Sequence, residues 1–286
     1  MTKTVQNFSR QTLQRRNFLK TAAVSAVGLS SLSSFSFAAE GKHIPLSVQV
    51  YSVRKAAEKD LSGTLKKLAE IGFEAVEFAG YYGKDAKEIR KYLDDAGIQC
   101  SGTHTQLTDI RKDFDKVVEI HKTLGTKYII VPWINPKEFD TAEKIEKYAD
   151  EFNGYAEKAK QAGMAVGYHA HAGDAQQVDG KTAFERFFEK TTSDVVMQVD
   201  VGNYMSGGGD PYKMLELFKG RAKTIHIKEF GGTAIGTGKV DWKKVFDLCE
   251  TVGGTEWYVI EDEVKADSFD TLIADYAGMK KLGKTK

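Results

Sequence analysis

The chain of 286 residues has only two cysteines, Cys100 and Cys249, far apart in the sequence. They fall on different kinds of predicted secondary structure, and we expect two free thiols that are buried rather than reactive. No Gly-x-Gly-x-x-Gly follows the first predicted strand, which removes the usual reason to expect a dinucleotide-binding fold. No P-loop-like phosphate cradle is present either, so we expect a substrate without a phosphate group.

The chain also lacks a strong excess of charge, because 41 basic and 40 acidic residues leave a net charge of +1. Residues 1–38 hold five basic residues and no acidic one, so the rest of the chain has a net charge of −4. A nucleic-acid partner needs a clustered positive surface for its phosphates, and this mildly acidic body argues against one. Beyond the N-terminal segment, no stretch of the sequence is typical of a membrane span.

The N-terminal segment contains two adjacent arginines, Arg15 and Arg16, then Phe18-Leu19-Lys20 and a weakly apolar stretch of small residues. This pattern resembles a twin-arginine export signal. The alternative, a membrane anchor, is disfavoured because serines interrupt the apolar run. Ser36-Phe37-Ala38 offers a cleavage site, so we expect residues 1–38 to be a signal peptide and the mature chain to be exported to the periplasm.

From residue 45 to residue 286, short β-rich runs alternate with segments of helical periodicity. Several of these segments end in glycine just before the next strand, the expected C-cap position (Gly72, Gly97, Gly125 and Gly163). Eight such repeats are typical of a single-domain (β/α)8 TIM barrel, an α/β fold. An open, doubly wound sheet is the alternative. The predicted strands cover residues 46–52, 74–79, 98–104, 127–133, 164–171, 195–200, 222–229 and 256–262.

Polar and aromatic residues gather at the C-terminal ends of these strands, where the active sites of TIM barrels lie. They are Gln49, Tyr51, Glu77, His104, Trp133, His169, His171, Asp200, Asn203, His226, Lys228 and Glu261. Singly, each has a structural alternative: Trp133 as a rim aromatic, Asp200 as the cap of the next turn, Lys228 as the ion-pair partner of a carboxylate. Their gathering at one end of the barrel is what indicates a functional site.

Four of these side chains occur at equivalent depths of four consecutive strands: His169, Asp200, His226 and Glu261. Neighbouring strands are about 4.8 Å apart, so the four side chains can converge on one ion. Two imidazoles and two carboxylates suit a divalent metal such as Mn²⁺, Zn²⁺ or Co²⁺. His171 lies one pleat further out than His169, on the same side of the predicted strand.

The strand-end motifs resemble those of the sugar phosphate isomerase/epimerase superfamily, the xylose isomerase-like TIM barrels. The resemblance extends from residue 45 to residue 286 and rests on VQVYSVR, GYHAH, VDVGN, HIKE, GTGKVDW and VIEDE, in this order. It implies one divalent metal ion held by one residue from each of strands five to eight, here His169, Asp200, His226 and Glu261. The epimerases have glutamate where His169 stands. A subgroup with the pattern YHNH is similar here, with Ala170 in place of the asparagine.

The resemblance implies a metal-dependent isomerase or epimerase that removes a proton beside the carbonyl of a non-phosphorylated keto-sugar. Glu261 is the expected base, with His171 second. Because His169 replaces the second glutamate of the epimerases, a lyase or dehydratase acting on a keto-sugar or 3-keto-glycoside is the alternative. A non-catalytic sugar-binding barrel is a more distant alternative, and the acidic charge and export signal oppose an endonuclease-IV-like enzyme.

The remaining strand-end residues are expected to contact the substrate. Aromatic rings would stack on the sugar, and polar groups would bind its hydroxyls or a developing oxyanion. The predicted substrate-binding residues are Tyr51, Glu77, His104, Trp133, Asn203 and Lys228. The expected partner is therefore a small carbohydrate, with neither nucleic acid nor membrane insertion of the mature chain, and self-association into a homo-oligomer is compatible with this prediction.

Overall fold

The computed structural model describes residues 43–263 and 268–286. The predicted signal peptide and its cleavage site lie outside these residues, so export stays a prediction. Among the described residues, no helix is both long and apolar enough to cross a membrane.

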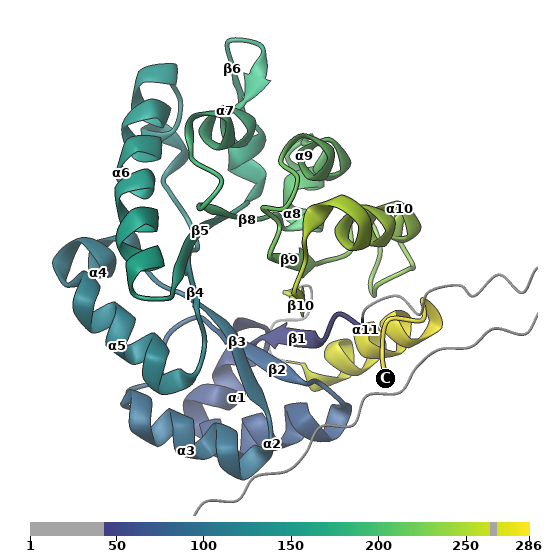
Figure 1. Ribbon diagram of the computed structural model, residues 1–286. Coiled ribbons are helices and arrows are strands. Elements are labelled where there is room, and N and C mark those ends of the chain that lie inside the picture. Colours follow the sequence, from purple (N-terminus) through teal and green to yellow (C-terminus); the bar gives the residue numbers. More distant parts are fainter. Residues whose placement is uncertain (1–42, 264–267) are drawn as a thin grey trace, which may run out of the picture. The chain divides into compact units, whose positions relative to one another are not determined.

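Within the described residues, eight parallel strands form a nearly closed barrel with helices around its outside (Figure 1). The strands β1 to β5 and then β8, β9 and β10 follow one another around it, and β10 pairs with β1. A single bridge between Asp200 and His226 joins β8 to β9. The predicted (β/α)8 barrel is thus confirmed, and the open sheet is wrong. The barrel strands are β1 (Leu46–Gln49), β2 (Ala75–Phe78), β3 (Gln99–His104), β4 (Tyr128–Val131), β5 (Ala165–His169), β8 (Val196–Gln198), β9 (Thr224–Ile227) and β10 (Trp257–Ile260).

The helices begin and end at residues that satisfy their free backbone groups. Asp60, Asp85 and Asp113 accept hydrogen bonds at the first turns of three helices, as N-caps do. The predicted C-cap glycines of the same helices have left-handed backbones. The helices are α1 (Arg54–Lys59), α2 (Leu61–Ile71), α3 (Ala86–Ala96), α4 (Leu107–Lys112), α5 (Phe114–Leu124), α6 (Ala142–Gln161), α7 (Ala183–Lys190), α8 (Val201–Ser206), α9 (Pro211–Leu217), α10 (Trp242–Leu248) and α11 (Phe269–Lys281).

The barrel interior changes from apolar to polar along its axis. Near the N-terminal ends of the strands, Tyr128, Ile130 and Val196 form a small buried cluster, separate from the large core cluster that includes strand and helix residues. At the C-terminal ends the buried side chains are polar, among them Gln49 and Glu77. Apolar packing therefore closes one end of the barrel and leaves the polar groups to the other end.

Several strands are shorter than predicted, because turns of helix begin at their C-terminal ends. The first strand stops at Gln49, where a 3-10 turn (Val50–Val53) follows, and β5 stops at His169. His171 caps a second 3-10 turn (Ala172–Ala175) and so lies beyond the strand. A small antiparallel hairpin, β6 (Gln177–Val178) and β7 (Lys181–Thr182), follows this turn and was not expected. Both cysteines are free and buried, as predicted.

Candidate active site

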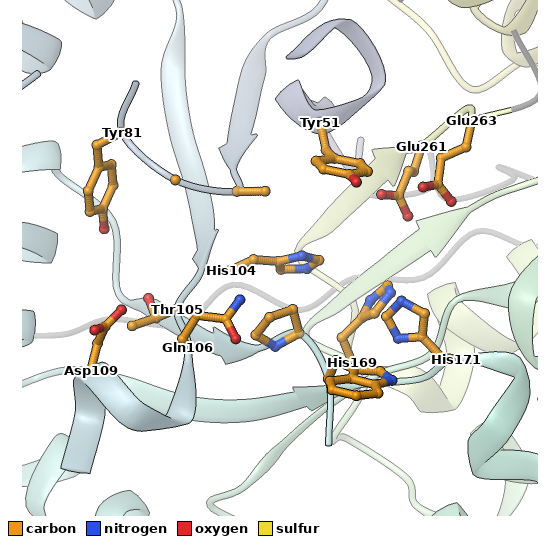
Figure 2. Close-up of a pocket in the computed structure, with 14 residues that line it drawn as sticks. Tyr51, Tyr81, His104, Thr105, Gln106, Asp109, His169, His171, Glu261 and Glu263 are labelled. Atoms are coloured by element: carbon orange, nitrogen blue, oxygen red, sulfur yellow. The ribbon is translucent and has the colours of Figure 1, made fainter. Parts of the chain in front are cut away.

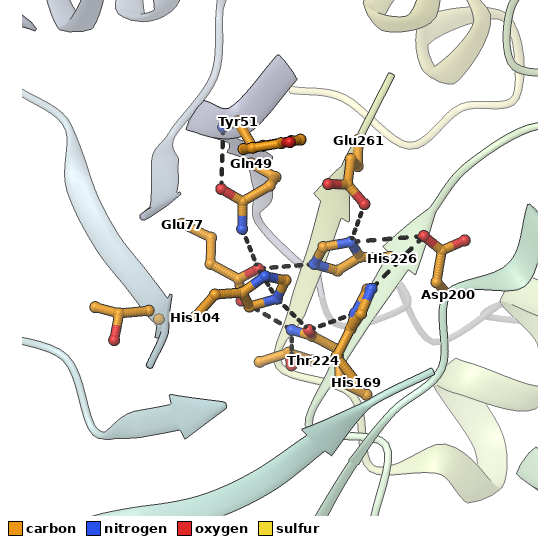
Figure 3. Close-up of polar contacts among 12 residues, drawn as sticks. Gln49, Tyr51, Glu77, His104, His169, Asp200, Thr224, His226 and Glu261 are labelled. Atoms are coloured by element: carbon orange, nitrogen blue, oxygen red, sulfur yellow. Dashed lines mark hydrogen bonds and ion pairs between the residues drawn. The ribbon is translucent and has the colours of Figure 1, made fainter. Parts of the chain in front are cut away.

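Four potential metal ligands meet at the C-terminal end of the barrel (Figure 3). His169 ends β5, Asp200 follows β8, His226 lies in β9 and Glu261 follows β10. One ligand atom from each residue lies within 4.8 Å of those of the other three, and all four side chains are buried. The structure thus brings together the four residues that the sequence predicts as ligands.

The spacing of these atoms fits a coordination shell. His226 Nδ1 lies 3.1 Å from Glu261 Oε2 and 4.0 Å from Asp200 Oδ2, and His169 Nε2 lies 3.9 Å from Asp200 Oδ2. In a tetrahedral shell with metal–ligand bonds near 2.1 Å, ligand atoms are roughly 3.4 Å apart. The donor set, two imidazole nitrogens and two carboxylate oxygens, therefore fits a divalent ion with small adjustments.

Hydrogen bonds behind the two imidazoles fix which nitrogen faces the cluster. His226 Nε2 donates to Glu77 Oε1 at 2.7 Å, which leaves Nδ1 toward Glu261 and Asp200. The amide nitrogen of Gln198 donates to Glu77 and Thr224, so its Oε1 accepts the proton of His169 Nδ1 at 2.9 Å. His169 Nε2 is then free to act as a ligand. Such outer partners are typical of metal-binding histidines.

Glu77 is the centre of this supporting network. Its carboxylate accepts hydrogen bonds from Gln49 Nε2 (2.8 Å), Gln198 Nε2 (2.8 Å) and His226 Nε2 (2.7 Å), and His104 Nε2 lies 3.0 Å away. Burial by itself would raise the pKa of Glu77, but His104 and His226 outweigh burial and hold the pKa below its usual range. Glu77 is therefore a buried anion whose contacts fix the orientation of His226 and His104.

The protonation of the cluster is coupled to ion binding. Burial opposes a charge on His226, but Glu77 and Glu261 raise its pKa to about 10. Burial also holds the pKa of His169 well below its usual range, which favours the neutral, ligating form of that ring. A cation at His226 Nδ1 has to displace a proton, so metal affinity falls as pH falls.

Asp200 has two structural tasks besides its place in the cluster. It caps α8, accepting from Asn203 N and Asn203 Nδ2, both at 2.8 Å, and it forms the bridge to β9. A Cβ on Gly202 would lie 2.8 Å from Lys228 O, so glycine is needed for α8 to begin this close to β9. Burial raises the pKa of Asp200 to about 7 against the opposing effect of Lys228.

A cavity of about 420 Å³ opens onto the ligand cluster (Figure 2). The metal end is lined by His169, Glu261, His171, Glu263 and Tyr51, with His104 near the middle (Figure 2). Among the described residues, the lining contains no lysine or arginine. A cavity with carboxylates and without such a cation suits neutral hydroxyl groups better than a phosphate.

His171 is the histidine of the cavity that the ligand cluster does not use. Its ring lies beside that of His169, with ring centres 4.8 Å apart, and its Nδ1 has no hydrogen-bond partner among the described residues. Burial lowers the pKa of His171 to about 4, so the ring is neutral near pH 7. Its backbone N–H donates to Asp174 Oδ2 at 2.7 Å, which fixes the turn that carries it.

The structure separates the predicted substrate contacts into two groups. Tyr51, His104 and Trp133 line the cavity, and the exposed fractions of Tyr51 and Trp133 are 37% and 49%. Glu77 and Asn203 do not line it: Glu77 is fully buried below the histidines, and the Asn203 amide binds Asp200. We reassign these two residues from substrate binding to support of the ligands, because their polar atoms are already engaged.

Lys228 lies beside the ligand cluster rather than in the cavity lining. Its Nζ pairs with Glu263 and lies 3.6 Å from Glu261 Oε2 and 3.9 Å from Asp200 Oδ2. Lys228 is therefore an ion-pair partner of a carboxylate, as one interpretation of the sequence had it. It also lies next to the predicted metal ligands.

Residue-by-residue reading of the sequence missed Gln198, which accepts from both His104 and His169. A signal for it exists, since Gln198 precedes Asp200 by two positions and two residues of a strand at that spacing face the same side.

The sequence and fold were compared with known proteins. Residues 65–280 match the family described as xylose isomerase-like TIM barrel. An inosose dehydratase from Geobacillus thermodenitrificans is 24% identical over 242 residues, which cover 70% of this chain and 80% of that protein.

Solved structures share the fold at lower identity. A sugar phosphate isomerase/epimerase from Parabacteroides distasonis superposes with a TM-score of 0.72 at 22% identity, covering 87% of this chain and 99% of that one. The IolI protein with a bound zinc atom superposes with a TM-score of 0.63 at 14% identity, covering 84% and 96%.

Proposed function

Since this chain belongs to the xylose isomerase-like TIM barrel family, whose relatives here are sugar-modifying enzymes, we propose that it catalyses a metal-dependent elimination on a non-phosphorylated keto-sugar. The reaction class is that of a lyase or dehydratase. The named activity of the inosose dehydratase relative supports this choice over the isomerisation expected from the sequence.

One observation of the site carries the proposal. The carboxylates at the metal end of the cavity, Glu261 and Glu263, both come from the C-terminal end of β10, whereas the end of β5 supplies His169 and His171. Epimerisation by two opposed carboxylates needs one on each face of the sugar. An elimination needs only one carboxylate base, here Glu261, which can pass the proton on to the leaving group, and the neutral His171 ring can donate a hydrogen bond to that group.

The four ligands His169, Asp200, His226 and Glu261 would hold one divalent ion, with Mn²⁺, Zn²⁺ and Co²⁺ as candidates. The zinc atom in the IolI structure supports a divalent metal in this fold. When bound, the ion supplies Lewis-acid polarisation of a substrate carbonyl, which acidifies the neighbouring C–H bond.

The residues of the chain then carry the proton transfers. Glu261 takes the proton from the carbon next to the carbonyl, and the electron pair of the broken C–H bond forms a carbon–carbon double bond. The substituent on the next carbon leaves with its own electron pair and takes the proton that Glu261 removed, while the neutral His171 ring donates a hydrogen bond to the leaving oxygen. The products are an unsaturated ketone and water or an alcohol, and no oxidant or reductant is consumed. Lys228 offsets negative charge at Glu261.

A second candidate is isomerisation or epimerisation, favoured by the facing positions of Glu261 and His171 in the cavity (Figure 2). The likeness to the isomerase/epimerase from Parabacteroides distasonis is one of fold. In this case Glu261 would remove the proton and then return it to a different position of the sugar, with the neutral His171 ring donating a hydrogen bond to a sugar oxygen.

The deciding experiment uses metal-loaded protein in D₂O with an inosose and with 3-keto-hexoses, followed by NMR and mass spectrometry. Elimination gives a product lighter by one water or alcohol with a new double bond. Isomerisation gives a product of substrate mass with deuterium next to the carbonyl. Metal-loaded protein that gives neither deuterium exchange nor product overturns both candidates.

We further propose that the chain acts outside the cytoplasm, on the basis of the Arg15–Arg16 pattern. Replacing both arginines by lysine should retain the protein in the cytoplasm, as cell fractionation would show. Unchanged fractionation would contradict export by this signal.

A further inference from the structure

The cavity extends well beyond the metal ligands, along the ends of β2, β3 and β4. Its far arm is lined by Tyr81, Thr105, Gln106 and Asp109. In Figure 2, Tyr81, Thr105 and Asp109 lie at the opposite end of the cavity from Glu261, Glu263 and His171. A keto-sugar ring held at the metal end leaves these residues without a ligand.

A second cavity adjoins the far arm. A neighbouring cavity of about 230 Å³ shares Tyr81, Thr105 and Asp109 with it and continues along α4 and α5 to Lys112 and Lys116. The two cavities adjoin at these three residues. The main cavity itself is elongated, with the ligand cluster at one end and Tyr81, Thr105 and Asp109 at the other (Figure 2).

The far arm offers an aromatic wall and polar groups that are free to bind. The ring of Tyr81 supplies the aromatic wall. Among the described residues, neither the Gln106 amide nor the Asp109 carboxylate has a side-chain hydrogen bond or an ion pair. Aromatic faces with carboxylate and amide groups suit the apolar faces and hydroxyl groups of a sugar ring.

The floor of the far arm is held in place from below. The Thr105 hydroxyl lies 2.8 Å from the Thr103 hydroxyl, which in turn lies 2.7 Å from His121 Nε2. This part of the cavity wall is held in place before a ligand arrives, so binding costs little conformational entropy.

From this geometry we propose that the substrate is a glycoside of at least two sugar units. The oxidised ring lies at the metal end, and a second, neutral sugar ring occupies the far arm beside Tyr81 and Asp109. This inference rests on the proposed function and adds that the group expelled in the elimination is the second sugar, released through its hydroxyl group, rather than water. The glycosidic C–O bond breaks, its electron pair stays on the leaving oxygen, and that oxygen takes the proton that Glu261 removed.

The test compares ketones that differ in size. A methyl glucoside and four disaccharides of different linkage, each oxidised to the ketone at C3 of the non-reducing ring, are assayed with metal-loaded enzyme. We expect at least one disaccharide to exceed the methyl glycoside at least tenfold in kcat/KM, because binding of a remote ring contributes to transition-state stabilisation. If no disaccharide exceeds it threefold, the inference is wrong while the proposed function stands. No turnover of any ketone overturns the proposed function instead.

Variants locate the second ring. Asp109→Asn should lower kcat/KM for the preferred disaccharide about tenfold more than for the methyl glycoside, since it removes a charged acceptor. Asp150→Asn, on the exposed surface of α6, is the matched control and should change neither. An equal effect of Asp109→Asn on both substrates contradicts the inference.

A binding measurement that needs no turnover completes the test. In saturation-transfer NMR with the unoxidised disaccharides, protons of both rings should receive saturation, and Gln106→Ala should weaken the signal of the second ring. Saturation confined to one ring overturns the proposal even if catalysis is absent.

Discussion

Replacing Glu77 by glutamine tests how the structure orients the His226 ligand. The substitution keeps the size of the side chain but exchanges one acceptor oxygen for an NH₂ group. In the wild type, the carboxylate receives the proton of His226 Nε2 at 2.7 Å, and Gln49 and Gln198 each donate to it at 2.8 Å. Glutamine has one acceptor oxygen for these donors. We therefore expect His226 Nε2 to accept a hydrogen bond from the new amide. The proton of the ring would then lie on Nδ1, the nitrogen that faces the ligand cluster.

The magnitude follows from this loss of orientation. Changes in the hydrogen-bond partner of a ligating histidine typically weaken metal binding about 10- to 100-fold, which equals about 1.4–2.7 kcal/mol. Stability falls as well, because the variant leaves buried donors without a full partner. Removing one partner from a buried charged pair costs about 3–5 kcal/mol. Metal affinity must therefore be measured below the unfolding temperature of the variant.

The assay is competition for Zn²⁺ or Mn²⁺ with a fluorescent chelator, together with ¹⁵N NMR of the histidine rings. Glu185→Gln is the control, because Glu185 is also buried but pairs with Lys213 away from the site. We expect Glu77→Gln to lower affinity and shift the His226 tautomer, and Glu185→Gln to do neither. Wild-type affinity in a folded Glu77→Gln protein would refute the role assigned to Glu77.

Three further predictions concern the ion and the buried histidines. A chelator should lower the melting temperature of the wild type but not of Asp200→Asn, which keeps the α8 cap and loses a charged ligand; an equal shift in both would place the ion elsewhere. His171→Ala should reduce kcat about 100-fold, because it removes a hydrogen-bond donor to the leaving oxygen, and should retain one ion per chain, whereas His169→Gln should lose the ion, as metal analysis would show; loss of the ion from His171→Ala would make that residue a ligand. His121 is buried with its pKa lowered to about 4, so its stabilising neutral form is fully present above pH 6.5 and stability is lost as pH falls from 6.5 toward 4. Between pH 7 and pH 5, urea unfolding of His121→Gln should therefore lose about 2 kcal/mol less than the wild type; parallel curves would contradict this.

The fold and the ligand set could be predicted because they depend on short-range patterns. The β-rich runs and C-cap glycines mark the repeat, and parallel strands place their ends at one face of the barrel. His169, Asp200, His226 and Glu261 could then be grouped from their depth in consecutive strands. Their convergence is a property of the barrel and needs no knowledge of individual contacts.

The supporting network could not be assigned in the same way. Glu77 and Asn203 look like substrate contacts in the sequence, because periodicity gives the face of a residue but not whether its polar atoms are already engaged. The hairpin after β5 had a signal in Asp179-Gly180, both with positive φ, a dipeptide typical of tight hairpin turns. The far arm of the cavity depends on α4 and on the loop after β2, whose placement follows from tertiary packing.

The bridge between Asp200 and His226 ties the ligand cluster to the continuity of the sheet. These two residues form the contact that joins β8 to β9, and both supply atoms to the cluster. Any motion that parts the two strands also parts two ligands, so opening of the barrel at this point and release of an ion are one event. An ion held there acts as a cross-link between chain segments. Its affinity is therefore linked to the free energy of separating β8 from β9.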